Sequence, residues 1–365
     1  MHRMSLFRRA HGAPLAVVAV TTLVMVGALA YCGRGGGSGG GSPASAIRPG
    51  SPLGLSHEGS PSVAPSPSPS AAQSSVDADP ARSPRSAGSR SSTGHPPITS
   101  WVYQLQDYPD GRLDALARAP YPLAVIDLAR DARSDFFRAN EIDQLHRSGK
   151  RVLAYFEIGS IEDFRPEYPR LWQDDGDLIL NRWPDWPEEY FVRYWDERWW
   201  DKVVRPRIDQ AIKAGFDGAY LDTPLAYEEL DLALVPGRNR DWLAQAMVRL
   251  IERISEYAKA RQPGFWVVPQ NSPELRHYPG YTAAIDGIGM EELFYLATDV
   301  PCREDFCAEN LENVRALRRA GKLVLAVDYA RRAENIRHAC ARYAAERFAG
   351  YVTTVDLDRI SPPCP

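Results

Sequence analysis

Short apolar segments alternate with amphipathic helical patterns over residues 98–365 of this chain. Several helical patterns end in a glycine just before the next apolar segment, at Gly149, Gly215, Gly321 and Gly350, the position where a helix end favours a left-handed residue. This alternation predicts a parallel α/β sheet. The predicted strands cover residues 101–106, 123–128, 151–158, 218–222, 265–270, 285–291, 323–328 and 350–355. The predicted helices include residues 139–148, 199–214, 241–260, 311–320 and 333–348.

Eight predicted strands in one segment of this length fit a closed (β/α)8 TIM barrel. An open, doubly wound sheet is the alternative, but no Gly-x-Gly-x-x-Gly turn follows the first strand, as a dinucleotide-binding fold of that kind would require. We therefore expect an α/β fold of the (β/α)8 class, and nothing in the sequence indicates a cofactor.

The aromatic residues mark where the folded domain begins. Only Phe7 and Tyr31 of the chain's 37 aromatic residues precede residue 98, and a segment without aromatic residues buries too little apolar surface to fold. Residues 33–97 are rich in Gly, Ser and Pro, which predicts a disordered linker. We expect one folded domain at residues 98–365, as a monomer.

The N-terminal residues 1–32 have the order of an export signal, because arginines precede an apolar segment at residues 13–31. Three outcomes fit this segment: cleavage after Ala30, lipid attachment at Cys32, or retention as a membrane anchor that tethers the protein. Each outcome places the domain outside the cytoplasm, secreted or on the cell surface.

The folded domain contains four cysteines, an even number that suggests two disulfides in an exported protein. Of the three connectivities, we favour neighbours in sequence, Cys302 with Cys307 and Cys340 with Cys364. The seven histidines are scattered and no paired Cys-x-x-Cys spacing occurs, so no metal site is predicted.

Most predicted strands end in a polar or acidic residue, and the carboxyl ends of the strands carry the active site in a (β/α)8 barrel. Successive strand residues face opposite sides, and the outer face must pack on helices. Placing Ile288 and Met290 outward turns Glu291 inward, and the same argument turns Tyr220 and Asp222 inward. Tyr155 and Glu157 share one face of their strand. We therefore predict a pocket whose central carboxylates are Asp222 and Glu291.

The chemistry of such a pocket is limited by the motifs that are absent. The sequence contains no Gly-x-Ser-x-Gly elbow and no Walker loop. Paired carboxylates among aromatic residues are the groups that glycoside hydrolysis uses, because one acid protonates the leaving oxygen while the other attacks or activates water. The tryptophan-rich segment at residues 185–195 adds further aromatic side chains.

Six motifs are similar to glycoside hydrolase family 114, the endo-α-1,4-polygalactosaminidase-like barrels. They are Tyr-Gln-Leu-Gln at 103–106, Val-Ile-Asp at 125–127, Ala-Tyr-Phe-Glu-Ile-Gly at 154–159, Asp-Gly-Ala-Tyr-Leu-Asp at 217–222, Gln-Asn at 270–271 and Glu-Glu-Leu-Phe at 291–294. The resemblance implies a hydrolase of α-1,4-linked galactosamine polymers, with Asp222 and Glu291 as its acids; we favour Asp222 as the nucleophile. The expected substrate-binding residues are Tyr103, Gln104, Asp127, Tyr155, Glu157, Tyr220, Asn271, Asp328 and Tyr329.

The charge distribution agrees with such a substrate. The chain carries a formal net charge of −4, and its acidic residues are concentrated in the domain, which argues against nucleic acid as a partner. Deacetylated galactosamine is cationic, so Asp127, Glu157 or Asp328 could bind its ammonium groups. Two other functions remain open: a non-catalytic carbohydrate-binding barrel, and a glycosidase that acts on a different polysaccharide.

Overall fold

The computed structural model describes residues 98–365. The export segment 1–32 with Cys32 and the linker 33–97 lie outside the described residues, so their predictions stay untested. Within the described part of the chain, no helix is long and apolar enough to cross a membrane.

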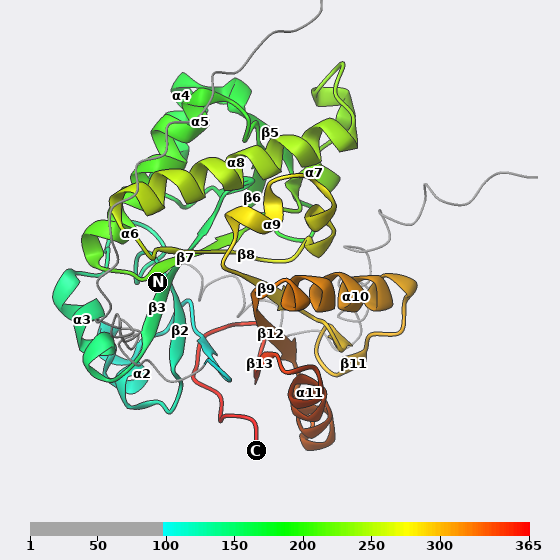
Figure 1. Ribbon diagram of the computed structural model, residues 1–365. Helices are drawn as coiled ribbons and strands as arrows, with labels where there is room; N and C mark the ends of the chain where they lie inside the picture. Colours follow the sequence, from blue (N-terminus) through cyan, green and yellow to red (C-terminus); the bar gives the residue numbers. More distant parts are fainter. Residues whose placement is uncertain (1–97) are drawn as a thin grey trace, which may run out of the picture. The chain divides into compact units, whose positions relative to one another are not determined.

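Eight parallel strands form the centre of the domain (Figure 1). All eight predicted strands are present, with ends that differ from the prediction by a few residues. They are β1 (Val102–Tyr103), β2 (Leu123–Asp127), β3 (Arg151–Glu157), β7 (Gly218–Asp222), β8 (Trp266–Pro269), β9 (Gly287–Glu291), β12 (Leu323–Tyr329) and β13 (Ala349–Thr353).

Two single bridges close these strands into a ring. Continuous pairing joins β1, β2, β3, β7 and β8 in one sheet and β9, β12 and β13 in another. Gln270 then pairs with Gly289 between β8 and β9, and Ser100 pairs with Gly350 between the start of β1 and β13. All of these pairings are parallel, so the predicted (β/α)8 barrel is confirmed.

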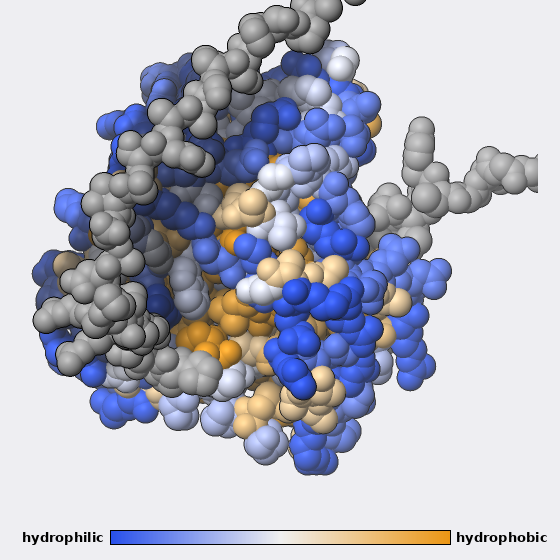
Figure 2. Space-filling model, in the orientation of Figure 1, coloured by the Kyte–Doolittle hydropathy of each residue, from blue (hydrophilic) through white to orange (hydrophobic). Residues whose placement is uncertain are grey.

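Helices surround the barrel and turn hydrophilic surfaces outward, while apolar residues show between them near the centre of one face (Figure 2). Their lengths vary from 3 residues in α5 to 22 residues in α8. They are α2 (Asp114–Arg118), α3 (Ala139–Arg147), α4 (Tyr168–Asp174), α5 (Glu197–Trp199), α6 (Arg205–Ala214), α7 (Ala226–Glu229), α8 (Arg240–Arg261), α9 (Tyr281–Ala284), α10 (Asp305–Arg319) and α11 (Ala333–Glu346).

Three of the four predicted helix-ending glycines have the left-handed conformation, Gly149, Gly215 and Gly321. The prediction for Gly350 is wrong, because α11 ends earlier and Arg347 takes the left-handed conformation (φ 57°). Gly350 lies instead inside β13, where a Cβ atom would stand 2.1 Å from the Tyr343 ring. The glycine therefore lets α11 pack closely on the strand.

An antiparallel sheet is inserted between β3 and α6, and the sequence did not predict it. Its strands are β4 (Ser160–Glu162), β5 (Ile179–Arg182) and β6 (Glu189–Val192), in the order β4-β6-β5. A second insertion after β9 is the hairpin of β10 (Tyr295–Leu296) and β11 (Val300–Pro301). Because β4 starts three residues after β3 ends, the larger insertion begins at the carboxyl end of the barrel.

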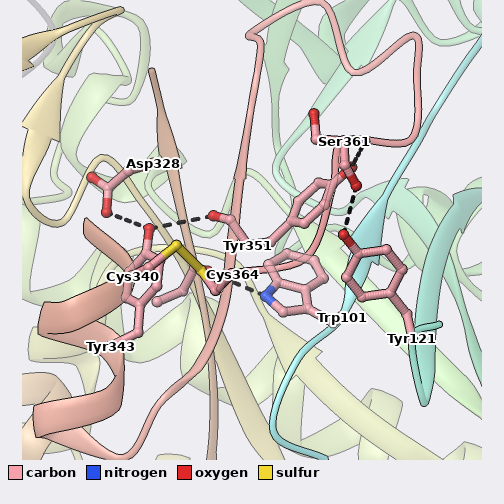
Figure 3. Close-up of a disulfide and its surroundings, with 9 residues drawn as sticks. Trp101, Tyr121, Asp328, Cys340, Tyr343, Tyr351, Ser361 and Cys364 are labelled. Carbon is pink, nitrogen blue, oxygen red and sulfur yellow. Dashed lines mark hydrogen bonds between the residues drawn. A yellow bond between two sulfur atoms is a disulfide. The ribbon is translucent and has the colours of Figure 1, made fainter. Parts of the chain in front are cut away.

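The C-terminal tail and α11 are fastened together beside the β13 edge (Figure 3). Cys340 of α11 forms a disulfide with Cys364 of the tail, and Cys302 pairs with Cys307. Both favoured pairings are thus present. The Tyr121 hydroxyl before β2 donates to the main-chain oxygen of Ser361 at 2.6 Å. The tail therefore joins α11, which precedes β13, to Tyr121, which precedes β2. These two segments lie on either side of the Ser100–Gly350 bridge that closes the barrel.

Aromatic side chains fill the barrel interior. The Tyr220 ring lies 5.3 Å from the Tyr103 ring and 5.8 Å from the Trp101 ring, centroid to centroid. Space for Tyr220 comes from β9, because a Cβ atom on Gly289 would stand 2.0 Å from the Tyr220 hydroxyl oxygen. Gly289 therefore faces inward, on the same side of β9 as Glu291.

We expect Gly289→Ala to destabilise the domain by about 1–3 kcal/mol, because the added methyl group displaces the buried Tyr220 ring. Urea unfolding of the variant measures the loss. Gly176→Ala is the matched control, since its Cβ atom would meet nothing within 4 Å. Equal free energies of unfolding for the two variants would contradict this packing.

Candidate active site

Asp222 and Glu291 lie at the carboxyl ends of β7 and β9, two strands that flank β8. Both side chains are partly exposed at the mouth of the barrel, while the residues before them in their strands are buried. The end of β8 contributes Gln270 and Asn271 to the same place. Three neighbouring strands thus bring the two carboxylates into one site.

Asp222 is held by two neutral donors. The Tyr155 hydroxyl donates to its Oδ2, and the Thr223 amide donates to its Oδ1 at 2.6 Å. Burial, and then the negative charge of Glu291, raises the pKa of Asp222 to about 7, although both hydrogen bonds favour the ionised form. Asp222 can therefore gain or lose a proton near neutral pH.

Glu291 accepts three hydrogen bonds. The Tyr329 hydroxyl donates to Oε1, while the side-chain amides of Gln270 and Asn271 donate to Oε2, the latter at 3.1 Å. Asn271 also accepts the main-chain N–H of Glu291 at 3.0 Å, which fixes the direction of the strand end. Burial raises the pKa of Glu291, and these side-chain hydrogen bonds reduce the rise.

Tyrosines form the walls around this pair. The Tyr103 hydroxyl donates to Gln270 Oε1 at 3.0 Å, and the Tyr103 ring lies 6.2 Å from the Tyr155 ring. Burial raises the pKa of Tyr103, Tyr155, Tyr220 and Tyr329 well above the ordinary value. These hydroxyls therefore remain protonated. Those of Tyr103, Tyr155 and Tyr329 donate hydrogen bonds, whereas the buried Tyr220 hydroxyl has no hydrogen-bond partner among the described residues. The structure thus gathers five of the nine expected substrate-binding residues around the two carboxylates: Tyr103, Tyr155, Tyr220, Asn271 and Tyr329.

The Gln104 side chain stabilises a loop instead of facing Asp222 and Glu291. It is 2% exposed, and its amide donates to the main-chain oxygen of Gln106 at 3.1 Å. The amide also reaches the main-chain oxygen of Asp358 at 3.4 Å. Gln104 therefore contributes to the shape of the mouth through its neighbours.

Asp127 and Glu157 are buried in an ion network at the carboxyl ends of β2 and β3. Both Asp127 oxygens accept from Arg165 at 3.1 Å, and Glu157 accepts from Arg165 and Arg207. Burial alone would raise the pKa of Glu157, but the charges of the two arginines lower it below its ordinary value. With exposures of 0% and 1%, these carboxylates offer no free oxygen to a sugar.

Asp328 is also enclosed by its own chain. One oxygen accepts the main-chain N–H groups of Phe294 and Tyr295 at 2.7 and 2.8 Å, and the other accepts the Tyr343 hydroxyl at 2.5 Å (Figure 3). Burial raises the pKa of Asp328 to about 6 against these hydrogen bonds. The geometry gives Asp328 a structural role, so the expected ammonium contact has no support from this residue or from the ion network.

Several residues of this region were missed by sequence reasoning. Arg165 follows β4 in a loop and Arg207 lies on α6, and no spacing in the sequence relates either residue to the strand-end acids. Thr223 was missed although it directly follows Asp222. Within residues 98–365, no group of three or more His, Cys, Asp or Glu side chains could hold a metal ion.

Comparison with known proteins places this geometry in a family. The family model described as glycoside-hydrolase family GH114 matches residues 82–365. An uncharacterized protein of Deinococcus radiodurans is 31% identical over 264 residues, covering 72% of this chain and 82% of the relative. An uncharacterized protein of Thermotoga maritima is 31% identical over 237 residues, 64% of this chain and 71% of the relative.

Two solved structures share the fold. The glycoside hydrolase domain of PelA from Pseudomonas aeruginosa has a TM-score of 0.57 at 15% identity, covering 73% of this chain and 99% of that domain. Aspergillus fumigatus Ega3, crystallised with galactosamine, has a TM-score of 0.57 at 18% identity, covering 74% of this chain and 98% of Ega3. Together with the family match, the barrel and its inward-facing motifs show that this chain belongs to glycoside-hydrolase family GH114.

Proposed function

We propose that this glycosidase cleaves α-1,4-linked galactosamine-containing polysaccharide outside the cytoplasm, using Asp222 and Glu291 as its two acids. The observation that carries this proposal is the arrangement of the two carboxylates at the ends of β7 and β9, where the charge of Glu291 acts on Asp222. Family membership and the galactosamine bound to Ega3 support the substrate class.

In the proposed reaction, Asp222 attacks the anomeric carbon while Glu291 protonates the leaving oxygen. The contacts of Glu291 indicate where its proton resides. Oε2 accepts from two amide groups, which cannot accept a proton in return, whereas Oε1 accepts from the Tyr329 hydroxyl, and a hydroxyl can also act as an acceptor. The proton therefore sits on Oε1, and Tyr329 reverses its hydrogen bond when Glu291 is protonated.

The positive charge of a galactosamine substrate favours ionised Asp222, the form that attacks the sugar. A cation beside a carboxylate stabilises its ionised form, and the amino group on C2 is adjacent to the carbon that Asp222 attacks. Binding of an ammonium sugar therefore lowers the pKa of Asp222 from about 7 and favours the ionised nucleophile. An N-acetylated sugar lacks this charge and this effect.

We expect Asp222→Asn and Glu291→Gln each to lower kcat for a galactosamine polymer by about 10²- to 10⁴-fold, because each removes one half of the acid pair. Product release is measured by chromatography, and polymer binding should persist. Asp356→Asn is the matched control, since it removes an acid beyond the end of β13. Unchanged hydrolysis in either variant removes that residue from the mechanism.

A panel of galactosamine, N-acetylgalactosamine and glucosamine polymers tests the substrate class with the purified protein. We expect galactosamine-containing chains to be cleaved fastest, because their ammonium groups favour ionised Asp222. Cleavage of only the fully acetylated polymer would contradict the electrostatic argument. Binding without cleavage of any polymer would favour the carbohydrate-binding alternative.

We expect Glu291→Gln to lower the pKa of Asp222 from about 7, because the substitution removes the charge that raises it. The pKa should stay above the ordinary value of 3.8, since burial is the larger cause. Carbon-13 NMR titration of the carboxyl group measures the change. Glu292→Gln is the matched control, and an equal shift in both variants would contradict the specific pairing.

A further inference from the structure

Thr223 has an unfavourable backbone conformation directly after Asp222. Its φ is 61°, in the left-handed region that β-branched residues avoid, and the residue is fully buried. Such strain persists only where surrounding contacts hold it, and it concentrates at functional sites. At Thr223 it aims the main-chain N–H at Asp222 Oδ1, 2.6 Å away.

The Thr223 hydroxyl is the centre of contacts that hold this conformation. It donates to the main-chain oxygen of Asp222 at 2.8 Å and accepts the Gly159 N–H at 3.0 Å. The end of β3 approaches so closely that a Cβ atom on Gly159 would stand 2.2 Å from the Thr223 main-chain oxygen. The ends of β3 and β7 are thus locked together at the candidate nucleophile.

Ser160 of β4 links this contact to a buried acid of the insertion. Its hydroxyl lies 2.8 Å from Thr223 Oγ1 and also contacts Glu189 Oε1 of β6. A hydroxyl has a single hydrogen, so Ser160 can donate to only one of these oxygens. When Glu189 is protonated, its O–H donates to Ser160, and Ser160 donates to Thr223. When Glu189 is ionised, Ser160 turns its hydrogen to Glu189 and Thr223 loses that donor.

The surroundings of Glu189 favour its protonated form. Burial raises its pKa most, followed by the negative charges of Glu162 on β4, Asp222 on β7 and Glu157 on β3. Tyr155 of β3 faces the same cluster as a neutral hydroxyl. The positive charges nearby belong to Arg165, which lies 2.8 Å from Glu162 and also pairs with Glu157, and to Arg207, which pairs with Glu157.

We propose that Thr223 and Glu189 are positioning residues that fix the Asp222 carboxylate through the chain Glu189–Ser160–Thr223. The inference rests on the proposed role of Asp222 as the nucleophile. Glu189 acts as a neutral donor that holds Thr223 in its strained conformation, and Thr223 presents its N–H to the reacting carboxylate. The inserted sheet thereby contributes to the chemistry of the barrel without touching the substrate.

The first test compares Thr223→Val, which keeps the shape but lacks the hydroxyl, with Thr223→Ser, which keeps the hydroxyl. We expect the valine variant to lose about 10- to 100-fold in kcat on a galactosamine polymer, because a small misplacement of a reacting group has an effect of this size. KM should change by less than about threefold, and the serine variant should stay within about threefold of wild type.

Thr353→Val is the matched control, since Thr353 is a buried threonine at the end of β13 whose hydroxyl accepts from Ser361 at 2.9 Å. Thermal unfolding is measured for every variant, to distinguish variants that fail to fold from folded variants in which the Asp222 carboxylate is displaced. If the valine variant fails to fold, Ser160→Ala keeps the Thr223 hydroxyl but removes the Ser160 hydroxyl that donates to it, and we expect the same loss in kcat. Wild-type kcat in a folded Thr223→Val or Ser160→Ala variant overturns the proposal.

The second test uses Glu189→Gln, whose amide N–H replaces the carboxylic O–H as donor to Ser160. We expect activity near wild type, with the alkaline side of the pH profile moved to higher pH because glutamine does not ionise. Glu189→Ala should lose activity as Thr223→Val does. If Glu189→Gln is as impaired as Glu189→Ala, a negative charge at this position is required and the proposal is wrong.

A measurement without substrate separates this inference from the proposed function. We expect Thr223→Val to raise the pKa of Asp222 above about 7, because a displaced N–H no longer stabilises the carboxylate. Carbon-13 NMR titration detects the change. If wild type cleaves no polymer yet this shift occurs, the proposed function fails and the positioning contact stands. An unchanged pKa in Thr223→Val overturns the inference whether or not wild type is active.

Discussion

The carboxylates at the strand ends of this barrel lie largely out of bulk water, and an ionised carboxylate is stable there only with a partner. Two kinds of partner are present. Arg165 and Arg207 supply positive charge to Asp127 and Glu157 inside the barrel wall. Asp222, Glu291 and Asp328 receive neutral donors instead. The remaining features of the site follow from this difference.

The type of partner separates structural acids from acids that can exchange a proton. The arginines lower the pKa of Glu157 despite its burial, so Glu157 keeps a constant negative charge and ties α6 and the loop after β4 to the barrel. At Asp222, hydrogen bonds from neutral donors only partly offset the rise in pKa that burial causes, so the pKa is about 7. Asp328 is similar in pKa but fully enclosed. Asp222 and Glu291, the pair proposed to act on substrate, therefore differ from Asp328 in being partly exposed at the mouth of the barrel.

Much of this arrangement could be predicted from local patterns. The eight strands follow from apolar segments with intervening helices, and strand alternation alone turned Asp222, Glu291 and Tyr220 inward. The resemblance to a family then added a substrate class and further motifs. These features depend on residues close in sequence, where periodicity is informative.

The features that could not be predicted depend on residues far apart in sequence. Arg207 lies on α6, 50 residues beyond Glu157, and no periodicity indicates that the two residues meet. Strand ends that resemble one another, such as Val-Ile-Asp and Tyr-Leu-Asp, therefore gave no sign that Asp127 is enclosed while Asp222 is accessible. The inserted sheet of β4, β5 and β6 was missed because its strands are short and follow no long apolar pattern.

The choice of residue after Asp222 carries information of its own. A left-handed residue is needed there, and glycine or asparagine adopts that conformation at less cost than threonine. The end of β8 shows the less costly solution, since Asn271 has φ 60° and binds Glu291 with its side chain. Threonine at position 223 has a backbone strain that costs about 1–3 kcal/mol, but it provides a hydroxyl that a glycine would lack. That hydroxyl connects Gly159, Ser160 and Asp222, so the strained residue couples the inserted sheet to the barrel at the candidate nucleophile.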